Sequence, residues 1–249
     1  MHSYIAIQNT YEIFEIALFV DSKLVDKRRE DKHNTSKLFI PLLDELLTKN
    51  NAKISDFDFC AVNCGPGPFS TLRSIIASVN GLHFATNIPL ISIDGLEATF
   101  LEFYDNNYEN TVVLLNAFNN EVYYLIADGK QIVSKGYQKI DTFLNSVRNA
   151  STSSGRTERK TIFYSNSNPV RPEPVEGNER LIHFIGNGVT LHQPLIRETF
   201  GNNAVIKKPN PSMCSIEMIG KIGLEKWLLK QGATGYVMPL HLKKHAVEL

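Results

Sequence analysis

The segment from Phe57 to Phe84 constrains the fold of this chain more than any other. Phe57–Asn63 is short and almost continuously apolar, which is typical of a strand in the middle of a covered sheet. The loop Gly65-Pro66-Gly67-Pro68 follows. The next segment predicts a helix that starts at Phe69, because its apolar residues recur on one side: Leu72, Ile75, Ile76, Val79 and Leu82. Strand, tight loop and packed helix together indicate an α/β fold.

The flanking residues extend this unit to a lobe that we place at residues 1–105. Three short β-rich runs predict an antiparallel meander: Ser3–Gln8, Glu12–Val20 and Lys23–Arg28. Thr35–Lys49 then has the spacing of an amphipathic helix. After the central segment come a buried strand, Leu90–Ile93, and a helix, Leu96–Tyr104. Strands connected by helices predict a mixed sheet with helices packed on it.

A polar break at residues 106–110 marks the start of a smaller second lobe, residues 106–249. Its strands are predicted at Thr111–Asn116, Glu121–Ala127, Leu181–Ile185, Ala204–Lys207 and Gly235–Leu240. Helices are predicted at Asp141–Arg148, Leu191–Thr199 and Met213–Leu229, the last with Ser212 as N-cap and with the option of packing back on the first lobe.

Residues 150–179 differ in composition from the rest of the second lobe. They are rich in Ser and Pro and show no apolar periodicity. Loops of this length are uncommon inside compact domains and are usually either disordered or functional. We expect a disordered surface insertion, with a functional loop as the alternative.

Charge and cysteine content exclude several classes of protein. Lys+Arg and Asp+Glu each total 26, and such a balance argues against a protein that grips nucleic acid on its own. The three cysteines, Cys60, Cys64 and Cys214, fit reduced buried thiols better than a disulfide framework or a zinc site. The chain starts directly in a strand-like pattern and has no run long enough to span a membrane, so we expect a cytoplasmic protein.

The loop before Phe69 is a candidate anion contact. Glycines allow positive φ and close backbone approach, and a helix N-terminus exposes N–H groups and a favourable dipole. Ser70 and Thr71 add hydroxyl groups. Most strand–Gly–helix turns bind nothing, however, and the spacing matches neither the Walker pattern nor the dinucleotide fingerprint.

The longer string Gly65-Pro66-Gly67-Pro68-Phe69-Ser70-Thr71-Leu72-Arg73 closely resembles the Gly-Pro-Gly-Ser-Phe-Thr-Gly-Leu-Arg signature of the TsaB (YeaZ) family. The helix beginning Ser36-Lys37-Leu38-Phe39 also resembles that family's first helix, and Gly186-Asn187-Gly188 one of its later turns. The resemblance covers nearly the whole chain except the insertion.

The resemblance implies an actin-like/sugar-kinase/Hsp70 (ASKHA, ribonuclease H-like) fold with two lobes of mixed sheets flanked by helices. It also implies a non-catalytic scaffold that pairs with the catalytic protein TsaD and the ATPase TsaE. Together these proteins install threonylcarbamoyl on the adenosine next to the anticodon of certain tRNAs. The chain would need no cofactor of its own, since the partner complex uses ATP, and it would reach tRNA only through that complex.

The residues themselves argue against an independent enzyme. An actin-like ATP site needs a carboxylate near the first strand–turn, where this chain has Gln8. His241 and His245 have the i, i+4 spacing of a metal pair but lie in a basic tail outside the matching region. We therefore predict neither a catalytic residue nor a metal site. A small-molecule kinase or ATPase of the same fold is the alternative, and a peptidase is a further one.

We predict that the functional surface lies on the two helices Thr35–Lys49 and Phe69–Phe84. Both carry more apolar residues than one stripe needs, and helices that serve a core and a partner require a broad apolar arc. In the TsaB family, the corresponding helices serve both self-pairing and pairing with TsaD. The predicted interface residues are Leu38, Phe39, Leu42, Leu43, Leu46, Ile75, Val79 and Leu82.

Overall fold

The computed structural model describes residues 1–152, 181–240 and 242. Most of the expected insertion, together with His241 and His245, lies outside the described residues. The chain divides into two compact units: unit 1 is Met1–Glu102 with the chain from Met213 onward, and unit 2 is Phe103–Ser212. The expected second lobe therefore ends at Ser212 rather than at residue 249. No helix in the described ranges is long and apolar enough to cross a membrane.

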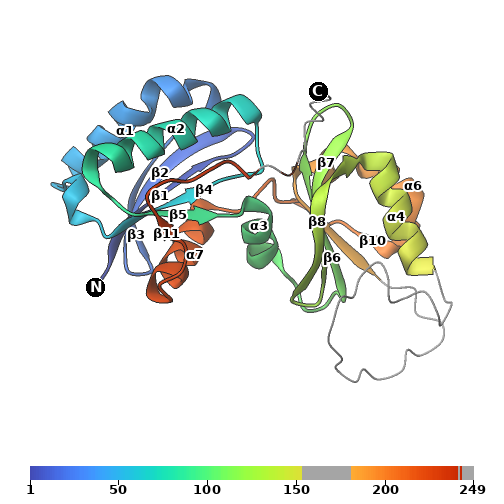
Figure 1. The fold of residues 1–249 in the computed structure, drawn as a ribbon. Coiled ribbons are helices and arrows are strands. Elements are labelled where there is room, and N and C mark those ends of the chain that lie inside the picture. The colour runs from blue at the N-terminus through green and yellow to red at the C-terminus, as the bar shows by residue number, and fades with distance from the viewer. Residues whose placement is uncertain (153–180, 241, 243–249) are drawn as a thin grey trace, which may run out of the picture. The chain divides into compact units, whose positions relative to one another are not determined.

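Unit 1 is built on a six-stranded mixed sheet with the order β11-β5-β4-β1-β2-β3 (Figure 1). Its strands are β1 (Ser3–Asn9), β2 (Ile13–Val20), β3 (Lys23–Asp31), β4 (Phe59–Asn63), β5 (Leu90–Ile93) and β11 (Ala233–Thr234). The first three form the expected antiparallel meander, and β1, β4 and β5 run parallel. β4 is buried along its whole length, as its apolar sequence predicts.

Helices cover both faces of this sheet. α1 (Thr35–Lys49) and α2 (Phe69–Thr86) lie on one face, and α7 (Ile216–Leu228) lies on the other (Figure 1). α3 (Gly95–Phe103) follows β5, and short 3₁₀ turns occupy Lys32–Asn34 and Ile54–Asp56. The core under α1 and α2 is made of aliphatic and aromatic side chains, among them Ile5, Ile7, Phe14, Phe39, Leu46, Val62, Ile75 and Val79.

The chain from Met213 onward differs from the prediction at both ends. α7 starts three residues later than expected, and its N-cap is Ser215 rather than Ser212. The Ser215 hydroxyl accepts from the Met218 N–H (3.2 Å), while Glu102 accepts from both the backbone N–H and the hydroxyl of Ser215 (2.6 Å each). The predicted last strand is also wrong: the sheet holds only Ala233–Thr234, and residues 235–240 leave its edge.

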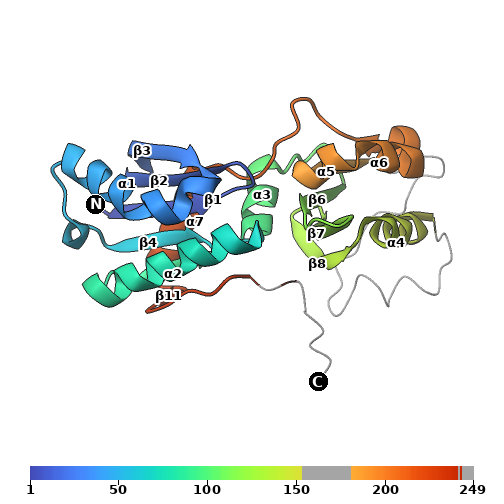
Figure 2. The same cartoon turned by 90° about the horizontal axis from the view of Figure 1, so that it is seen from above.

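Unit 2 contains a five-stranded sheet with the order β10-β9-β6-β7-β8. Its strands are β6 (Asn110–Asn116), β7 (Glu121–Asp128), β8 (Gln131–Lys139), β9 (Ile182–Ile185) and β10 (Ala204–Val205). Its helices are α4 (Ile140–Thr152), α5 (Asn187–Leu191) and α6 (Gln193–Phe200), with a 3₁₀ turn at Gly201–Asn203. Figure 2 shows α5 and α6 as separate helices, where the sequence predicted one.

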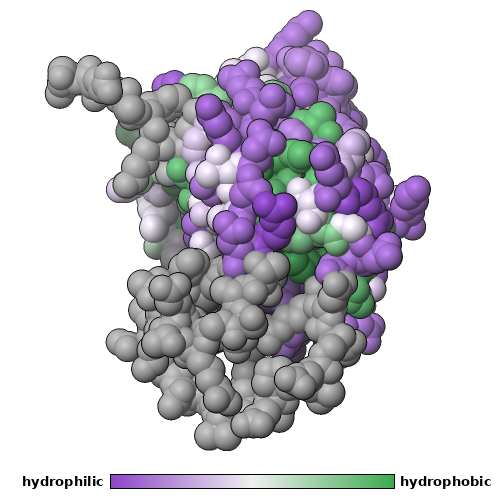
Figure 3. All heavy atoms as spheres, turned by 90° about the vertical axis from the view of Figure 1, so that its right-hand side faces the viewer, coloured by the Kyte–Doolittle hydropathy of each residue, from purple (hydrophilic) through white to green (hydrophobic). Residues whose placement is uncertain are grey.

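The core of unit 2 is carried by Val112, Leu114, Phe143, Phe184, Val189 and Ile196, with further apolar residues around them. Outside it, the face of this unit that Figure 3 draws is largely hydrophilic where it is not grey, with hydrophobic residues in small groups between polar ones. The two mixed sheets with flanking helices confirm the predicted α/β architecture.

A buried histidine sits in the sheet of unit 2. His183 on β9 is 1% exposed, and in the described part of the chain neither ring nitrogen has a hydrogen-bond partner. Its ring packs against Tyr108, over which the Lys207 ammonium lies, and Lys207 is paired with Asp105. Burial lowers the pKa of His183, and the charge of Lys207 lowers it further.

The close approach of α7 to the sheet depends on glycine. A Cβ at Gly223 would lie 2.5 Å from the Cβ of Ala61. We expect Gly223→Ala to destabilise the protein by about 1–3 kcal/mol, because overpacking outweighs the gain in helix propensity. Gly81→Ala is the matched control: Gly81 lies in α2 with nothing within 4 Å of its Cβ position, so this change should stabilise the protein by about 1 kcal/mol. Urea unfolding midpoints test both signs, and equal shifts for the two variants would contradict the packing argument.

The stability of unit 2 should fall in mild acid. A histidine whose folded-state pKa is lowered contributes fully above its unfolded pKa of about 6.5, and its contribution is lost as the pH falls below that value. The expected slope approaches about 1.4 kcal/mol per pH unit for one proton. His183→Phe should reduce the slope measured by urea unfolding between pH 7.5 and 5.5, with the exposed His33→Gln as control. His192, whose pKa burial also lowers, supplies the remainder. If His183→Phe left the slope unchanged, His183 would be ruled out as the origin of the pH dependence.

Candidate functional site: the loop Gly65–Arg73 and the outer face of α1 and α2

The loop after β4 is a buried structural turn. Gly65 has φ +99°, its N–H donates to the Asn63 side-chain oxygen (2.9 Å), and its carbonyl accepts from the Gly95 N–H (2.7 Å). A Cβ at Gly65 would lie 2.7 Å from a methyl group of Leu72. Only glycine combines this positive φ with that contact, so Gly65 fixes where α2 begins.

The signature residues after Gly65 separate into a buried part and an exposed part. Pro66, Gly67 and Pro68 are buried, and Leu72 is in the core. Pro68 is the N-cap of α2 and provides no side-chain cap. Phe69, Ser70 and Arg73 are exposed, and the Arg73 guanidinium lies 5.1 Å from the centre of the Phe69 ring. Thr71 donates its hydroxyl to the Pro68 carbonyl (3.2 Å), whereas the Ser70 side chain is exposed.

The position at which an actin-like ATP site would need a carboxylate is occupied here by a hydrogen-bonded amide. Gln8 is buried at the end of β1 and donates to a carboxylate oxygen of Glu15 (2.8 Å), which stands opposite it on β2. Glu15 is itself 6% exposed. Sequence reasoning missed this carboxylate, although the register of the meander would have placed it across from Gln8.

Further polar groups surround this strand end. Asn9 and Asn63 are buried, and side-chain amide atoms of both have no hydrogen-bond partner in the described ranges. The same ranges contain no cluster of three or more His, Cys, Asp or Glu side chains suited to a metal ion. Burial raises the pKa of the Cys64 thiol to about 11 and that of Cys214 to about 12, so both thiols are protonated at neutral pH.

The structure corrects the predicted interface on α1 and α2 residue by residue. Five of the eight predicted side chains are buried in the core and unavailable to a partner: Phe39, Leu43, Leu46, Ile75 and Val79. Leu38, Leu42 and Leu82 are half-buried, and the last two pack against the same core. The broad apolar arc of these helices is therefore used mainly within unit 1.

The outer face of α1 and α2 is formed by neighbouring residues. On α1, Ile40 (59% exposed) and Pro41 are exposed, and on α2 the exposed residues include Ala77, Gly81 and Phe84 (90% exposed). At 100° per residue, Ala77, Gly81 and Phe84 share one line along α2. Small residues in such a line permit the close approach of another helix.

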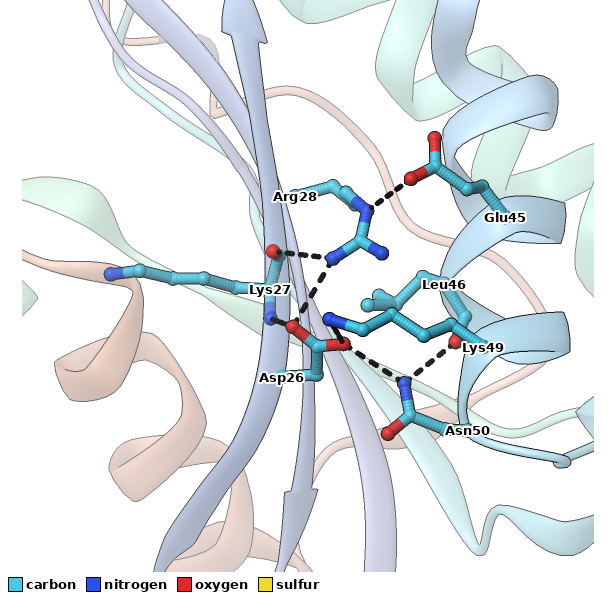
Figure 4. Close-up of polar contacts among 7 residues, drawn as sticks. All are labelled: Asp26, Lys27, Arg28, Glu45, Leu46, Lys49 and Asn50. Atoms are coloured by element: carbon cyan, nitrogen blue, oxygen red, sulfur yellow. Dashed lines mark hydrogen bonds and ion pairs between the residues drawn. The ribbon is translucent and has the colours of Figure 1, made fainter.

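A network of charges fastens α1 to strand β3 (Figure 4). Arg28 donates to Glu45 (2.8 Å) and to Asp26 (3.1 Å), and Asp26 also accepts from Lys49 (2.9 Å) and Asn50 (3.2 Å). The hydrogen bond from Lys49 lowers the pKa of Asp26 to about 2. These side chains neutralise one another at the C-terminal end of α1, which leaves the apolar residues as the distinctive feature of this face.

Comparisons with known proteins agree with this architecture. A sequence profile of the family described as "TsaD: tRNA N6-adenosine threonylcarbamoyltransferase" matches residues 29–236, more than half of the chain. The tRNA threonylcarbamoyladenosine biosynthesis protein TsaB of Haemophilus influenzae is 26% identical over 121 residues, which are 48% of this chain and 51% of that protein. The TsaB protein of Buchnera aphidicola subsp. Baizongia pistaciae is 23% identical over 123 residues, 49% of this chain and 56% of that protein. The chain belongs to the TsaB/YeaZ family.

The solved structures extend the match to the whole fold of this TsaB/YeaZ member. YeaZ from Pseudomonas aeruginosa superposes with a TM-score of 0.66 at 17% identity, covering 97% of this chain and 100% of that one. At this identity the likeness shows a shared fold, the ASKHA-like fold predicted from the sequence. The aligned part of this chain spans about half the length of the curated TsaB relatives that it matches.

Because Gln8 and Glu15 form a buried hydrogen bond, changing Gln8 alone to Glu should lower the free energy of unfolding more than exchanging both residues. Gln8→Glu would place two carboxylates face to face in a buried site, and we expect a loss of about 2–4 kcal/mol in stability. Adding Glu15→Gln reverses the pair and should recover most of that loss. The four unfolding free energies of this double-mutant cycle measure the coupling. Additive effects would show that the two side chains act independently.

Proposed function

We propose that this chain is a non-catalytic activating subunit of a tRNA-modifying complex. It would pair with a TsaD-like catalytic subunit and work with a TsaE-like ATPase, so that threonylcarbamoyl is installed on the adenosine adjacent to the anticodon. The observation that carries the proposal is the outer face of α1 and α2, where Ile40, Ala77, Gly81 and Phe84 are exposed and no element of the described ranges covers them. Membership of the TsaB/YeaZ family supports the choice of reaction.

The interior of unit 1 supports a role without chemistry of its own. Metal-assisted phosphoryl transfer needs carboxylates that are free to hold the ion. Here Gln8 replaces the expected acid, and the nearby Glu15 accepts a hydrogen bond from it. We infer that the chain carries no cofactor, that ATP is used by the partner complex, and that tRNA is reached through that complex in the cytoplasm. The same helices would also serve for pairing of two copies.

A small-molecule kinase or ATPase of the same fold is the second candidate. It is favoured by one observation: a buried carboxylate, Glu15, lies on β2 at the same level of the sheet as the end of β4, from which the Gly65 loop leaves, with only β1 between the two strands. Isothermal titration of the isolated chain with Mg-ATP separates the two candidates. Tight metal-dependent binding that is lost in Glu15→Gln would favour the kinase and contradict the non-catalytic role.

The partner surface is tested at Gly81. Wild-type chain should bind the TsaD-like subunit of the same organism at micromolar concentration or below, and should switch on tRNA modification when that subunit and TsaE are present. Gly81→Arg places a long cation in the middle of the outer face, and we expect it to weaken binding at least tenfold. Gly81→Ala is the matched control and should leave binding within about twofold of wild type. Wild-type binding that Gly81→Arg leaves unchanged would place the partner surface elsewhere.

A further inference from the structure

The chain between β11 and residue 240 forms an extended strap along α2. Residues 235–240 have no regular secondary structure, and Figures 1 and 2 both show them running beside α2. The Asn80 side chain of α2 forms two hydrogen bonds with the backbone of Val237 in the strap. Its amide nitrogen donates to the Val237 carbonyl (3.0 Å), and its amide oxygen accepts from the Val237 N–H (2.9 Å). Farther on, the Leu240 N–H donates to the Cys64 carbonyl (2.8 Å).

Alternation along the strap determines which side chains it exposes. Val237 is 3% exposed and belongs to the core under α2. In an extended chain the neighbours of an inward side chain point outward, and Tyr236 and Met238 are each 63% exposed. The two hydrogen bonds between the Asn80 side chain and the Val237 backbone, together with the burial of the Val237 side chain, hold Tyr236 and Met238 in exposed positions.

Helical geometry places the strap next to the outer face of α2. Asn80, which holds the strap, lies about 60° around the helix from Ala77, and Ala77 is on the line shared with Gly81 and Phe84. The strap therefore borders the exposed line rather than the core-facing side. Its aromatic and methionine side chains are of the types enriched in protein–protein interfaces.

We propose that the strap, residues 235–240, is part of the partner-binding surface, and that Tyr236 and Met238 contact the same TsaD-like subunit as α1 and α2. This inference rests on the proposed function and deepens it. Asn80 is then a positioning residue: it does not touch the partner, and it sets the place of the two side chains that do. Binding would cover Tyr236 and Met238 together with Phe84, three apolar side chains that are otherwise exposed.

Affinity measurements on the full-length chain test the strap. Tyr236→Ser and Met238→Ser should each weaken binding of the TsaD-like subunit about fivefold or more, and the double variant about thirtyfold or more. Leu229→Ser is the matched control, because Leu229 is 66% exposed at the end of α7, away from the face of α1 and α2. It should change the affinity less than twofold.

Hydrogen exchange and affinity measurements on an Asn80 variant test whether Asn80 acts by positioning the strap. Asn80→Ala should speed hydrogen exchange of the Val237 amide and weaken binding, yet it should add nothing in the Tyr236→Ser/Met238→Ser background, because the side chains that it positions are gone. A further loss of affinity in that background would mean that Asn80 touches the partner or holds α2 itself.

The outcomes separate the strap from the proposed function. If the strap variants bind within twofold of wild type while Gly81→Arg weakens binding, the strap is not part of the surface and the proposed function stands. If wild-type chain does not bind the TsaD-like subunit, both proposals are overturned. If it binds but neither the strap variants nor Gly81→Arg change the affinity, the strap proposal is overturned and the partner surface lies elsewhere on the chain.

Discussion

The buried turn at Gly65 is the constraint on which unit 1 depends. Gly65 lies close to three elements: its N–H donates to Asn63 at the end of β4, its carbonyl accepts from Gly95 at the start of α3, and a Cβ here would collide with Leu72 of α2. Because the turn has no room for a Cβ, the direction in which α2 leaves the sheet is fixed within narrow limits. The placement of α2 decides in turn which of its residues enter the core and which remain outside. The turn thus influences the surface of unit 1 without being part of it.

Much of this architecture could be predicted because its signals are local. The meander, the fully apolar β4 and the bounds of α1 follow from periodicity and from turn residues in adjacent positions. β8 was missed because it is a polar edge strand, Gln131–Lys139, with little burial to impose an alternating pattern. Helix α5 (Asn187–Leu191) was also missed, because its first residues belong to a Gly-Asn-Gly segment that is typical of a turn.

The candidate site was harder to predict because it depends on long-range contacts. The apolar arc of α1 is as broad as a partner surface requires, but the sheet and α2 already bury most of it, and no property of the helix sequence separates these two uses. The N-cap of α7 was placed at Ser212 instead of Ser215 because both are serines near prolines, and only the tertiary contact with Glu102 distinguishes them. Glu15 likewise gains meaning only when β1 and β2 are paired in register.

Strand β3 carries a consequence for how this protein meets other chains. It is an outer strand of nine residues, and within the described part of the chain no strand pairs with its second side. Open edges invite strand addition from other molecules and aggregation, and natural proteins block them with charge. All six residues of β3 after Val25 are charged, and Asp26 and Arg28 form ion pairs with side chains of α1. Extension of the sheet by a strand of another molecule is thereby discouraged at this edge.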